Sequence, residues 1–289
     1  MSWLTKRLED TEALVLTGVY DALSAKLLLQ SGCEAVYCSG FSACASQFGL
    51  PDIGLVSFDE FLQYFTRIKR ACGETPVVVD ADTGHGGLLN VARTVALFAQ
   101  AGINACHIED QVFPKRCGHL AVKEVVGRNE AVARVRTAVD AAKDTGMAII
   151  ARTDAIAPMG FDEALIRANL FLEAGAVAAF IDAPKTIEQL EAIPQRVQGP
   201  LVCNAAPIAP YPMPADDELE KMGYQVILHP IELLMAASAA IKHAVNTSKS
   251  NQSKDPKIDF LSFSELNATL ETERYLALEK TFSSPSRVS

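Results

Sequence analysis

Short apolar runs alternate with longer amphipathic stretches from residue 13 to about residue 245 of this chain. The runs are almost continuously apolar, whereas a strand with one face in water alternates apolar and polar residues. Continuous apolar character is typical of a parallel sheet that is covered on both faces. The pattern predicts eight strands, at residues 13–17, 35–38, 76–79, 105–108, 147–151, 178–181, 201–203 and 225–228.

The stretches between these strands have the apolar spacing of helices, for example at residues 22–30, 58–71, 89–100, 130–143 and 161–173. Eight successive strand–helix units predict a (β/α)8 barrel of the TIM type. The alternative is a doubly wound open sheet, which is weakened because no Gly-x-Gly-x-x-Gly motif follows the first strand. A glycine just past a helix end favours a left-handed cap, and four predicted helices end this way, at Gly32, Gly102, Gly175 and Gly223.

The C-terminal part departs from the barrel pattern at a polar stretch, NTSKSNQSKD. We divide the chain into a barrel at residues 1–246, a linker at 247–256 and a helical extension at 257–289. A helix with an apolar face must bury it, either on its own barrel or on a neighbouring subunit. The extension has such a face, with Leu261, Phe263, Leu266, Leu270, Tyr275 and Leu278 at helical spacing.

Composition narrows the class of partner. The net charge of −9 argues against nucleic acid or an anionic membrane surface as a ligand. No run of about 18 apolar residues is present to span a membrane, and the first ten residues do not read as a signal peptide. The seven cysteines are scattered without a Cys-x-x-Cys pair, which argues against a disulfide framework or a structural zinc site. We expect a protein of the reducing cytoplasm.

A polar or charged residue follows the apolar body of most predicted strands. Active sites of βα barrels lie at this end of the strands, so polar residues at the ends of several strands predict a catalytic barrel. The residues are Ser39 and Gly40, Asp80 and Asp82, Glu109, Arg152, Asp182 and Asn204.

Asp80, Asp82 and Glu109 predict a cluster of hard oxygen ligands. Two carboxylates two positions apart on an extended chain point the same way, and Glu109 follows the adjacent strand. Such a cluster suits Mg²⁺, which takes few carboxylates and leaves positions for water and substrate oxygens. Two alternatives are that Asp80 and Asp82 cap the following helix, and that the glycines after them cradle a phosphate, although a P-loop lysine is absent.

The segment Pro114–His119 contains a cysteine among cationic side chains. We expect Lys115, Arg116 and His119 to lower the pKa of Cys117, because positive charge favours the thiolate, and Gly118 to allow close approach of a ligand. The alternative is a surface loop with an incidental cysteine. Together with Arg152, a bidentate binder of carboxylates, these cations predict a small, multiply charged anion as substrate. We assign no role to His85, His107, His229 or His243.

In combination, several motifs resemble the isocitrate lyase/phosphoenolpyruvate mutase superfamily over roughly residues 13–282. The motifs are YDALSAKL (20–27), SG (39–40), LPDIG (50–54), DADTGHGG (80–87), HIEDQ (107–111), PKRCGH (114–119), ARTDA (151–155) and FLSFSEL (260–266).

The resemblance implies a barrel whose last helix is swapped with a neighbour, usually in a homotetramer built as a dimer of dimers. It implies Mg²⁺, with Mn²⁺ as the alternative ion, bound near Asp80, Asp82 and Glu109, partly through water. The substrate-binding residues that it implies are Tyr20, Ser39, Gly40, Asp52, Gly118, Asp182 and Asn204.

The resemblance also implies a mechanism. Residues 114–119 would close over a small carboxylate substrate, and a 2-hydroxy acid would break between C2 and C3 to leave pyruvate or glyoxylate. Cys117 would protonate the departing carbanion as general acid. Lys115, Arg116 and His119 would tune the thiol and bind the departing carboxylate, and Arg152 would bind a carboxylate.

Local departures from the family pattern favour a 2-alkylmalate, 2,3-dimethylmalate or 2-methylisocitrate type of substrate. Asp182 is similar to the residue of 2-alkylmalate-cleaving members, Phe41 replaces a usual glycine, and Ala205–Ala206 make the site more apolar. Pro158 stands where oxaloacetate hydrolases carry a serine. The alternatives are an oxaloacetate hydrolase or decarboxylase, a carboxyphosphonoenolpyruvate mutase-like enzyme, and a non-catalytic binder of keto acids.

Overall fold

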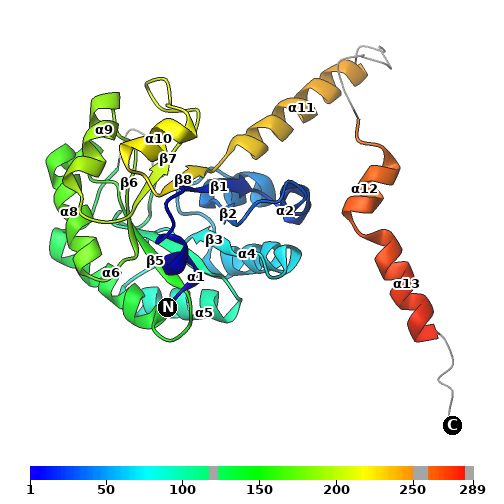
Figure 1. The fold of residues 1–289 in the computed structure, drawn as a ribbon, viewed down its shortest axis with the longest axis horizontal. Coiled ribbons are helices and arrows are strands. Elements are labelled where there is room, and N and C mark those ends of the chain that lie inside the picture. The colour runs from blue at the N-terminus through cyan, green and yellow to red at the C-terminus, as the bar shows by residue number, and fades with distance from the viewer. Residues whose placement is uncertain (117–122, 250–259, 284–289) are drawn as a thin grey trace, which may run out of the picture.

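Eight parallel strands close into a barrel in a computed structural model that describes residues 1–116, 123–249 and 260–283 (Figure 1). Each strand pairs with the next one in the chain, and β1 closes the ring on β8 through Leu14 opposite Val226. This confirms the predicted (β/α)8 barrel. The strands are β1 (Leu14–Val19), β2 (Val36–Cys38), β3 (Val77–Asp80), β4 (Ala105–Glu109), β5 (Ala148–Thr153), β6 (Ala178–Ile181), β7 (Leu201–Asn204) and β8 (Val226–His229).

Helices follow the strands and surround the barrel. The four glycines expected to end helices have positive φ angles, which confirms the repeated turn between helix and strand. The surrounding helices are α2 (Ala22–Leu29), α4 (Phe58–Cys72), α5 (Leu88–Gln100), α6 (Arg128–Ala142), α8 (Phe161–Glu173), α9 (Ile187–Arg196) and α10 (Asp216–Met222). The helix α11 (Glu232–Lys249) follows β8 and projects away from the barrel (Figure 1). Short helical turns α3 (Gly40–Ala43), η1 (Cys44–Phe48) and α7 (Ile156–Met159) lie at strand ends.

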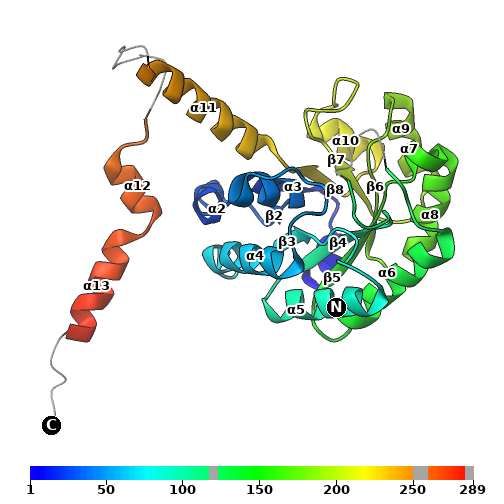
Figure 2. The ribbon, with the colours of Figure 1, turned by 180° about the vertical axis from the view of Figure 1, so that it is seen from behind.

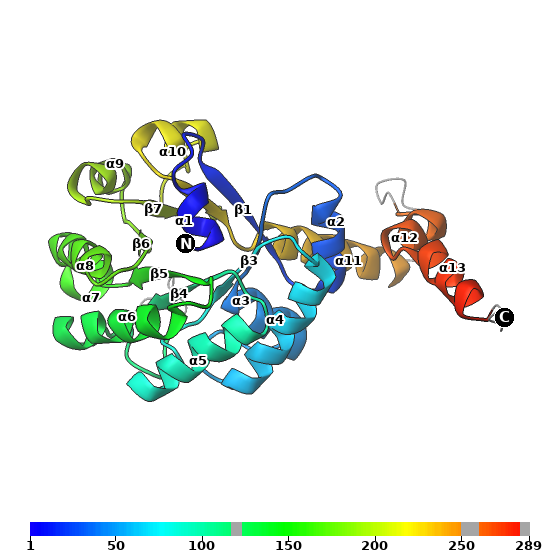
Figure 3. The same cartoon turned by 60° about the horizontal axis from the view of Figure 1, so that its bottom comes forward.

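The barrel interior is filled with side chains, so it is a core and not a channel. Leu14, Leu16, Ile150 and Phe180 meet inside it, all nearly inaccessible to solvent. The short N-terminal helix α1 (Trp3–Arg7) adds Leu4 to this cluster and lies across one end of the barrel (Figure 3). Because α1 covers the end at which the strands begin, the opposite end remains for a site.

The C-terminal helices α12 (Phe263–Thr269) and α13 (Thr272–Ser283) stand apart from the barrel, beyond the projecting α11 (Figures 1 and 2). No residue of α13 is buried, and Phe263 and Phe282 are more than 80% exposed. Lys26 Nζ lies 2.6 Å from Glu271 Oε2, which ties this arm to α2.

The predicted linker is partly helical, because α11 continues through Lys249 and so includes residues 247–249 of the expected linker. Residues 250–259 lie outside the described residues. Within the described part of the chain, no helix is long and apolar enough to cross a membrane.

Candidate active site

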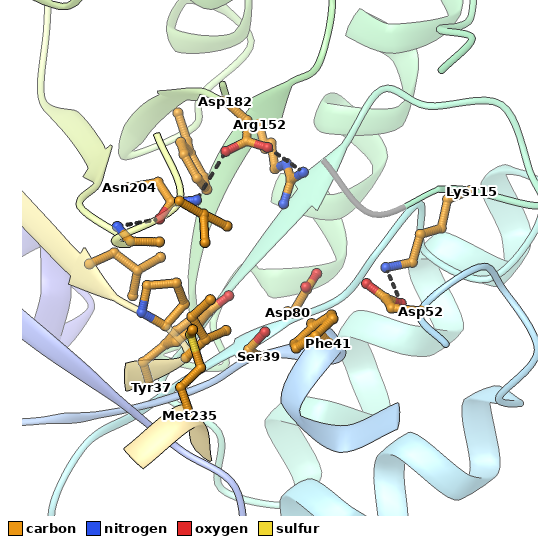
Figure 4. A pocket seen from close by; sticks show the side chains of 16 residues that line it. Tyr37, Ser39, Phe41, Asp52, Asp80, Lys115, Arg152, Asp182, Asn204 and Met235 are labelled. Atoms are coloured by element: carbon orange, nitrogen blue, oxygen red, sulfur yellow. Dashed lines mark hydrogen bonds and ion pairs between the residues drawn. The ribbon is translucent and has the colours of Figure 1, made fainter. Parts of the chain in front are cut away.

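The carboxyl ends of the strands surround a cavity of about 360 Å³ (Figure 4). The strands present their end residues to one another because all of them run in the same direction. The labelled lining residues are Tyr37, Ser39, Phe41, Asp52, Asp80, Lys115, Arg152, Asp182, Asn204 and Met235.

Seven of the residues expected in the site line this cavity. They are Ser39, Asp52, Asp80, Lys115, Arg152, Asp182 and Asn204. Gly40 lies against them, because its N–H donates to Asp80 Oδ2 at 3.2 Å. A Cβ on Gly40 would come within 3.0 Å of that oxygen and 3.3 Å of Asp82 Oδ1, so the close approach favours glycine.

Three other expected residues are not described by the structure, and Arg116 and Tyr20 do not line the cavity. Cys117, Gly118 and His119 lie outside the described residues. Arg116 is exposed, and its guanidinium donates to the carbonyl oxygens of Ile53, Pro114 and Lys115. Tyr20 is not among the residues that line the cavity, and its carbonyl accepts a hydrogen bond from Ser46 Oγ. The tyrosine in the lining is Tyr37, on β2.

Lys115 is buried between two aspartates. Its Nζ lies 2.6 Å from Asp52 Oδ1 and 2.7 Å from Asp82 Oδ1. Burial raises the pKa of Asp82 to about 7, against the pull of Lys115 and with a further rise from Asp80. Burial also raises the pKa of Glu109 well above its ordinary value. Around Lys115, carboxylates outnumber the cations that could compensate their charge.

This donor set fits a hard divalent cation. Glu109 Oε1 is buried without a hydrogen-bond partner. The N-cap residue of α5 is Gly87, so the alternative that Asp80 or Asp82 caps this helix is wrong. Unpaired carboxylate oxygens at strand ends are ligands that Mg²⁺ prefers. Among the described residues, however, no three His, Cys, Asp or Glu side chains stand ready to hold an ion as they are. A metal site here would need the side chains to rearrange.

Arg152 is the centre of a second ionic group. Its Nη2 lies 2.8 Å from Asp182 Oδ2, and its Nε lies 2.9 Å from Asp154 Oδ2 and 3.3 Å from Glu109 Oε2. Asn204 Nδ2 donates to Asp182 Oδ1 at 3.2 Å. Asp182 thus links Arg152 to Asn204 across β6, which holds the guanidinium in one orientation. Sequence reasoning missed Asp154, although it follows the strand that ends at Thr153.

A buried tyrosine–histidine pair was also missed. Tyr37 Oη lies 2.7 Å from His107 Nε2, and His107 Nδ1 lies 3.5 Å from Asp80 Oδ1. Burial raises the pKa of Tyr37 and lowers that of His107, which favours the neutral form of both. The available signal was the period of two along a strand, since Tyr37 stands two positions before Ser39 and His107 two before Glu109.

Part of the cavity wall is apolar. Phe41, Ala206, Ile208, Leu228, Ile231 and Met235 line it without any charged group among them. Figure 4 shows Met235 and Lys115 on different sides of the cavity. A ligand that fills the space would meet ionic groups near Lys115 and hydrocarbon near Met235.

Comparisons with known proteins agree on one family. The family model described as phosphoenolpyruvate phosphomutase matches residues 4–248. The chloroplastic carboxyvinyl-carboxyphosphonate phosphorylmutase of Arabidopsis thaliana is 36% identical over 280 residues, which are 96% of this chain and 83% of the relative. The 2,3-dimethylmalate lyase of Eubacterium barkeri is 34% identical over 276 residues, 95% of each chain. The structure of oxaloacetate acetylhydrolase with the inhibitor 3,3-difluorooxalacetate superimposes with a TM-score of 0.91 at 28% identity, covering 98% of this chain and 97% of that one.

Proposed function

The chain belongs to the phosphoenolpyruvate phosphomutase family, within the isocitrate lyase/phosphoenolpyruvate mutase superfamily, and on that premise we propose that it is a Mg²⁺-dependent carbon–carbon lyase of 2-alkylmalates. The substrate would be of the 2,3-dimethylmalate type, and the products pyruvate and a shorter carboxylate. Mn²⁺ is the alternative ion. The observation that carries this choice is the division of the cavity into an ionic and an apolar side.

The apolar side supports an alkyl substituent over a third carboxylate. Ala206, Ile208 and Met235 offer no hydrogen-bond donor from their side chains to a carboxylate. A charged group placed against them would lose water without gaining a partner, which disfavours a tricarboxylate such as 2-methylisocitrate. A methyl or ethyl group on the substrate gains from the same surface.

The ionic side supports binding and cleavage of a 2-hydroxy acid. Arg152 would bind one substrate carboxylate, while Ser39 and Gly40 would hold the keto-acid part. Asp80, Asp82 and Glu109 would hold the metal, partly through water, which would supply positive charge to polarise the oxygens on C1 and C2. The hydroxyl gives its proton to solvent water, the C2–C3 bond breaks with its electron pair going to C3, and C2 becomes the keto carbon of pyruvate. A proton returned to C3, from Cys117 Sγ in this proposal, completes the shorter acid.

A substrate panel tests the proposal. The protein is given Mg²⁺ and 2,3-dimethylmalate, 2-ethylmalate, 2-methylisocitrate, isocitrate or oxaloacetate, and all products are identified by NMR. We expect pyruvate and propionate from 2,3-dimethylmalate, in equal amounts, and loss of most turnover in Cys117→Ser. Pyruvate and succinate as the preferred products, from 2-methylisocitrate, would contradict the argument from the apolar wall.

Oxaloacetate hydrolysis is the second candidate, favoured by the close superposition on oxaloacetate acetylhydrolase. Pro158 lies in α7, is exposed and is not among the cavity-lining residues, so it does not count against hydrolysis as expected from the sequence. Oxalate and acetate as products of the panel would identify a hydrolase. A mutase-like activity would instead require a phosphonate substrate, which is added to the panel as a separate arm.

We further propose that α12 and α13 pack on a neighbouring subunit in a homo-oligomer, as a dimer of dimers. The exposed apolar residues of these helices support this, since they find little to contact on their own barrel. Light scattering on the full chain and on a chain ending at residue 249 tests it. We expect a tetramer for the first and a smaller assembly for the second; a monomer in both cases would contradict it.

A further inference from the structure

Lys115 occupies the carboxylate cluster in which the metal is proposed to bind. The residue is 3% exposed, and its ammonium lies 2.6 Å from Asp52 Oδ1 and 2.7 Å from Asp82 Oδ1. A buried lysine at this place cannot be an incidental surface contact, because an unpaired ammonium would not stay out of water.

The backbone on either side of Lys115 is held in place. The Gln111 side chain makes two hydrogen bonds to the backbone of Arg116, accepting from its N–H and donating to its carbonyl oxygen, both at 2.9 Å. Pro114 packs against Gly54, where a Cβ would come within 3.0 Å of the proline ring. Because its neighbours are anchored, Lys115 reaches the cluster from a defined direction.

The charge balance explains what Lys115 does there. Asp52, Asp80, Asp82 and Glu109 bring four carboxylates together. Arg152 pairs with one of them, Glu109, at 3.3 Å and is otherwise engaged with Asp154 and Asp182. Lys115 is therefore the cation that compensates Asp52 and Asp82 among the described residues. Asp82 Oδ1 lies 2.7 Å from its ammonium, and a metal ion bound to Asp82 would need the same oxygen.

We propose that Lys115 is an internal counter-cation that competes with the metal for Asp82 and gives up this aspartate, while keeping Asp52, when the metal binds. The inference rests on the metal site of the proposed function. Two positive charges at contact distance from one carboxylate oxygen repel each other, so occupation by one disfavours the other. Lys115 thus weakens metal binding, and its ammonium is freed toward the cavity only when the metal is present.

The test compares two buried lysines on either side of residues 117–122. Lys115→Met removes the charge from the cluster and keeps an unbranched side chain that is only one atom shorter. Lys123→Met is the matched control, because Lys123 is also buried and pairs with a strand-end carboxylate, Asp154, at 3.1 Å. Mg²⁺ is titrated by calorimetry into each chelator-treated protein without substrate.

We expect Lys115→Met to bind Mg²⁺ at least about tenfold more tightly than the wild type, within the range typical of coupled sites. The Mg²⁺ affinity of Lys123→Met should stay within about twofold of the wild-type value, since this variant leaves the competing cation Lys115 in place. An unchanged or weaker affinity in Lys115→Met would overturn the inference, and so would an equal gain in Lys123→Met. Absence of Mg²⁺ binding in every variant would overturn the metal site itself.

A second measurement uses the wild type and does not depend on the folding of a variant. Crystal structures with and without Mg²⁺ should show Lys115 Nζ within ion-pair distance of Asp52 in both, and of Asp82 only without the metal. An ammonium that stays on Asp82 beside the bound ion would overturn the inference. Neither measurement involves turnover, so both can still be interpreted if the substrate proposed for the panel assay is wrong.

Discussion

Tyr37 of β2 and His107 of β4 share a buried hydrogen bond of 2.7 Å at the strand ends, although 70 positions separate them. Tyr37 lines the cavity, while His107 is almost fully buried and turns its other ring nitrogen toward Asp80. The pair connects a cavity wall to a proposed metal ligand, and both residues act through neutral side chains.

Tyr37→Phe should therefore lower both stability and activity. The substitution leaves His107 Nε2 buried without a partner, which costs about 1–3 kcal/mol of unfolding free energy, measured by urea denaturation. Activity should fall because the cavity loses its phenolic hydroxyl. Tyr224→Phe is the control, since its buried hydroxyl donates to the Leu190 carbonyl at 2.8 Å away from the cavity. Equal loss of activity in both variants would mean that only stability is involved.

Asp182→Asn should impair substrate binding more than folding. Asp182 accepts from Arg152 and from Asn204, and an amide of the same shape cannot compensate the guanidinium. With its orientation less restricted, Arg152 should bind the substrate carboxylate less well. We expect kcat/KM to fall by about tenfold or more, mainly through KM. Steady-state kinetics measure this, and a loss in kcat alone would argue for a different role of Asp182.

Ile208→Ala should reduce selectivity for alkyl-substituted substrates. The shortened side chain removes part of the apolar wall, and a contact of this size discriminates by about 10-fold or more between substrates. The ratio of kcat/KM for 2,3-dimethylmalate to that for malate is the readout. Ile166→Ala serves as the control, because Ile166 is exposed on α8 and does not line the cavity. A ratio that does not change in Ile208→Ala would mean that the apolar wall does not contribute to substrate recognition.

His229 should make stability depend on pH. Its ring nitrogens lie 3.1 Å from Glu232 Oε1 and 3.0 Å from Asp216 Oδ1, and these contacts raise its pKa above the ordinary 6.5. Because the folded-state pKa is the higher one, the stabilisation is present in full below pH 6.5 and is lost as the pH rises above it. Unfolding free energies of the wild type and His229→Asn, measured from pH 5 to 9, test this. The difference between the two unfolding free energies should shrink toward high pH. A difference that grows toward high pH would mean that the pKa of His229 is lowered by folding and not raised.

Local patterns were sufficient for the barrel and for most of the polar strand ends. Continuous apolar runs located all eight strands to within about two residues, because both faces of such strands are buried whatever surrounds them. The end of each run then marked residues such as Asp80, Arg152 and Asn204, since a parallel barrel brings all of these ends together.

Which side chains meet was decided by the tertiary structure. Several features of the site depend on residues that are distant in the chain. Tyr37 rather than Tyr20 lines the cavity, Lys115 is buried between Asp52 and Asp82, and Lys123 pairs with Asp154. Pattern and spacing describe only neighbours along one strand or helix, whereas side-chain direction depends on how eight units close into a ring. The barrel could therefore be predicted from periodicity, but the ion pairs and the apolar wall of its site required the closed fold.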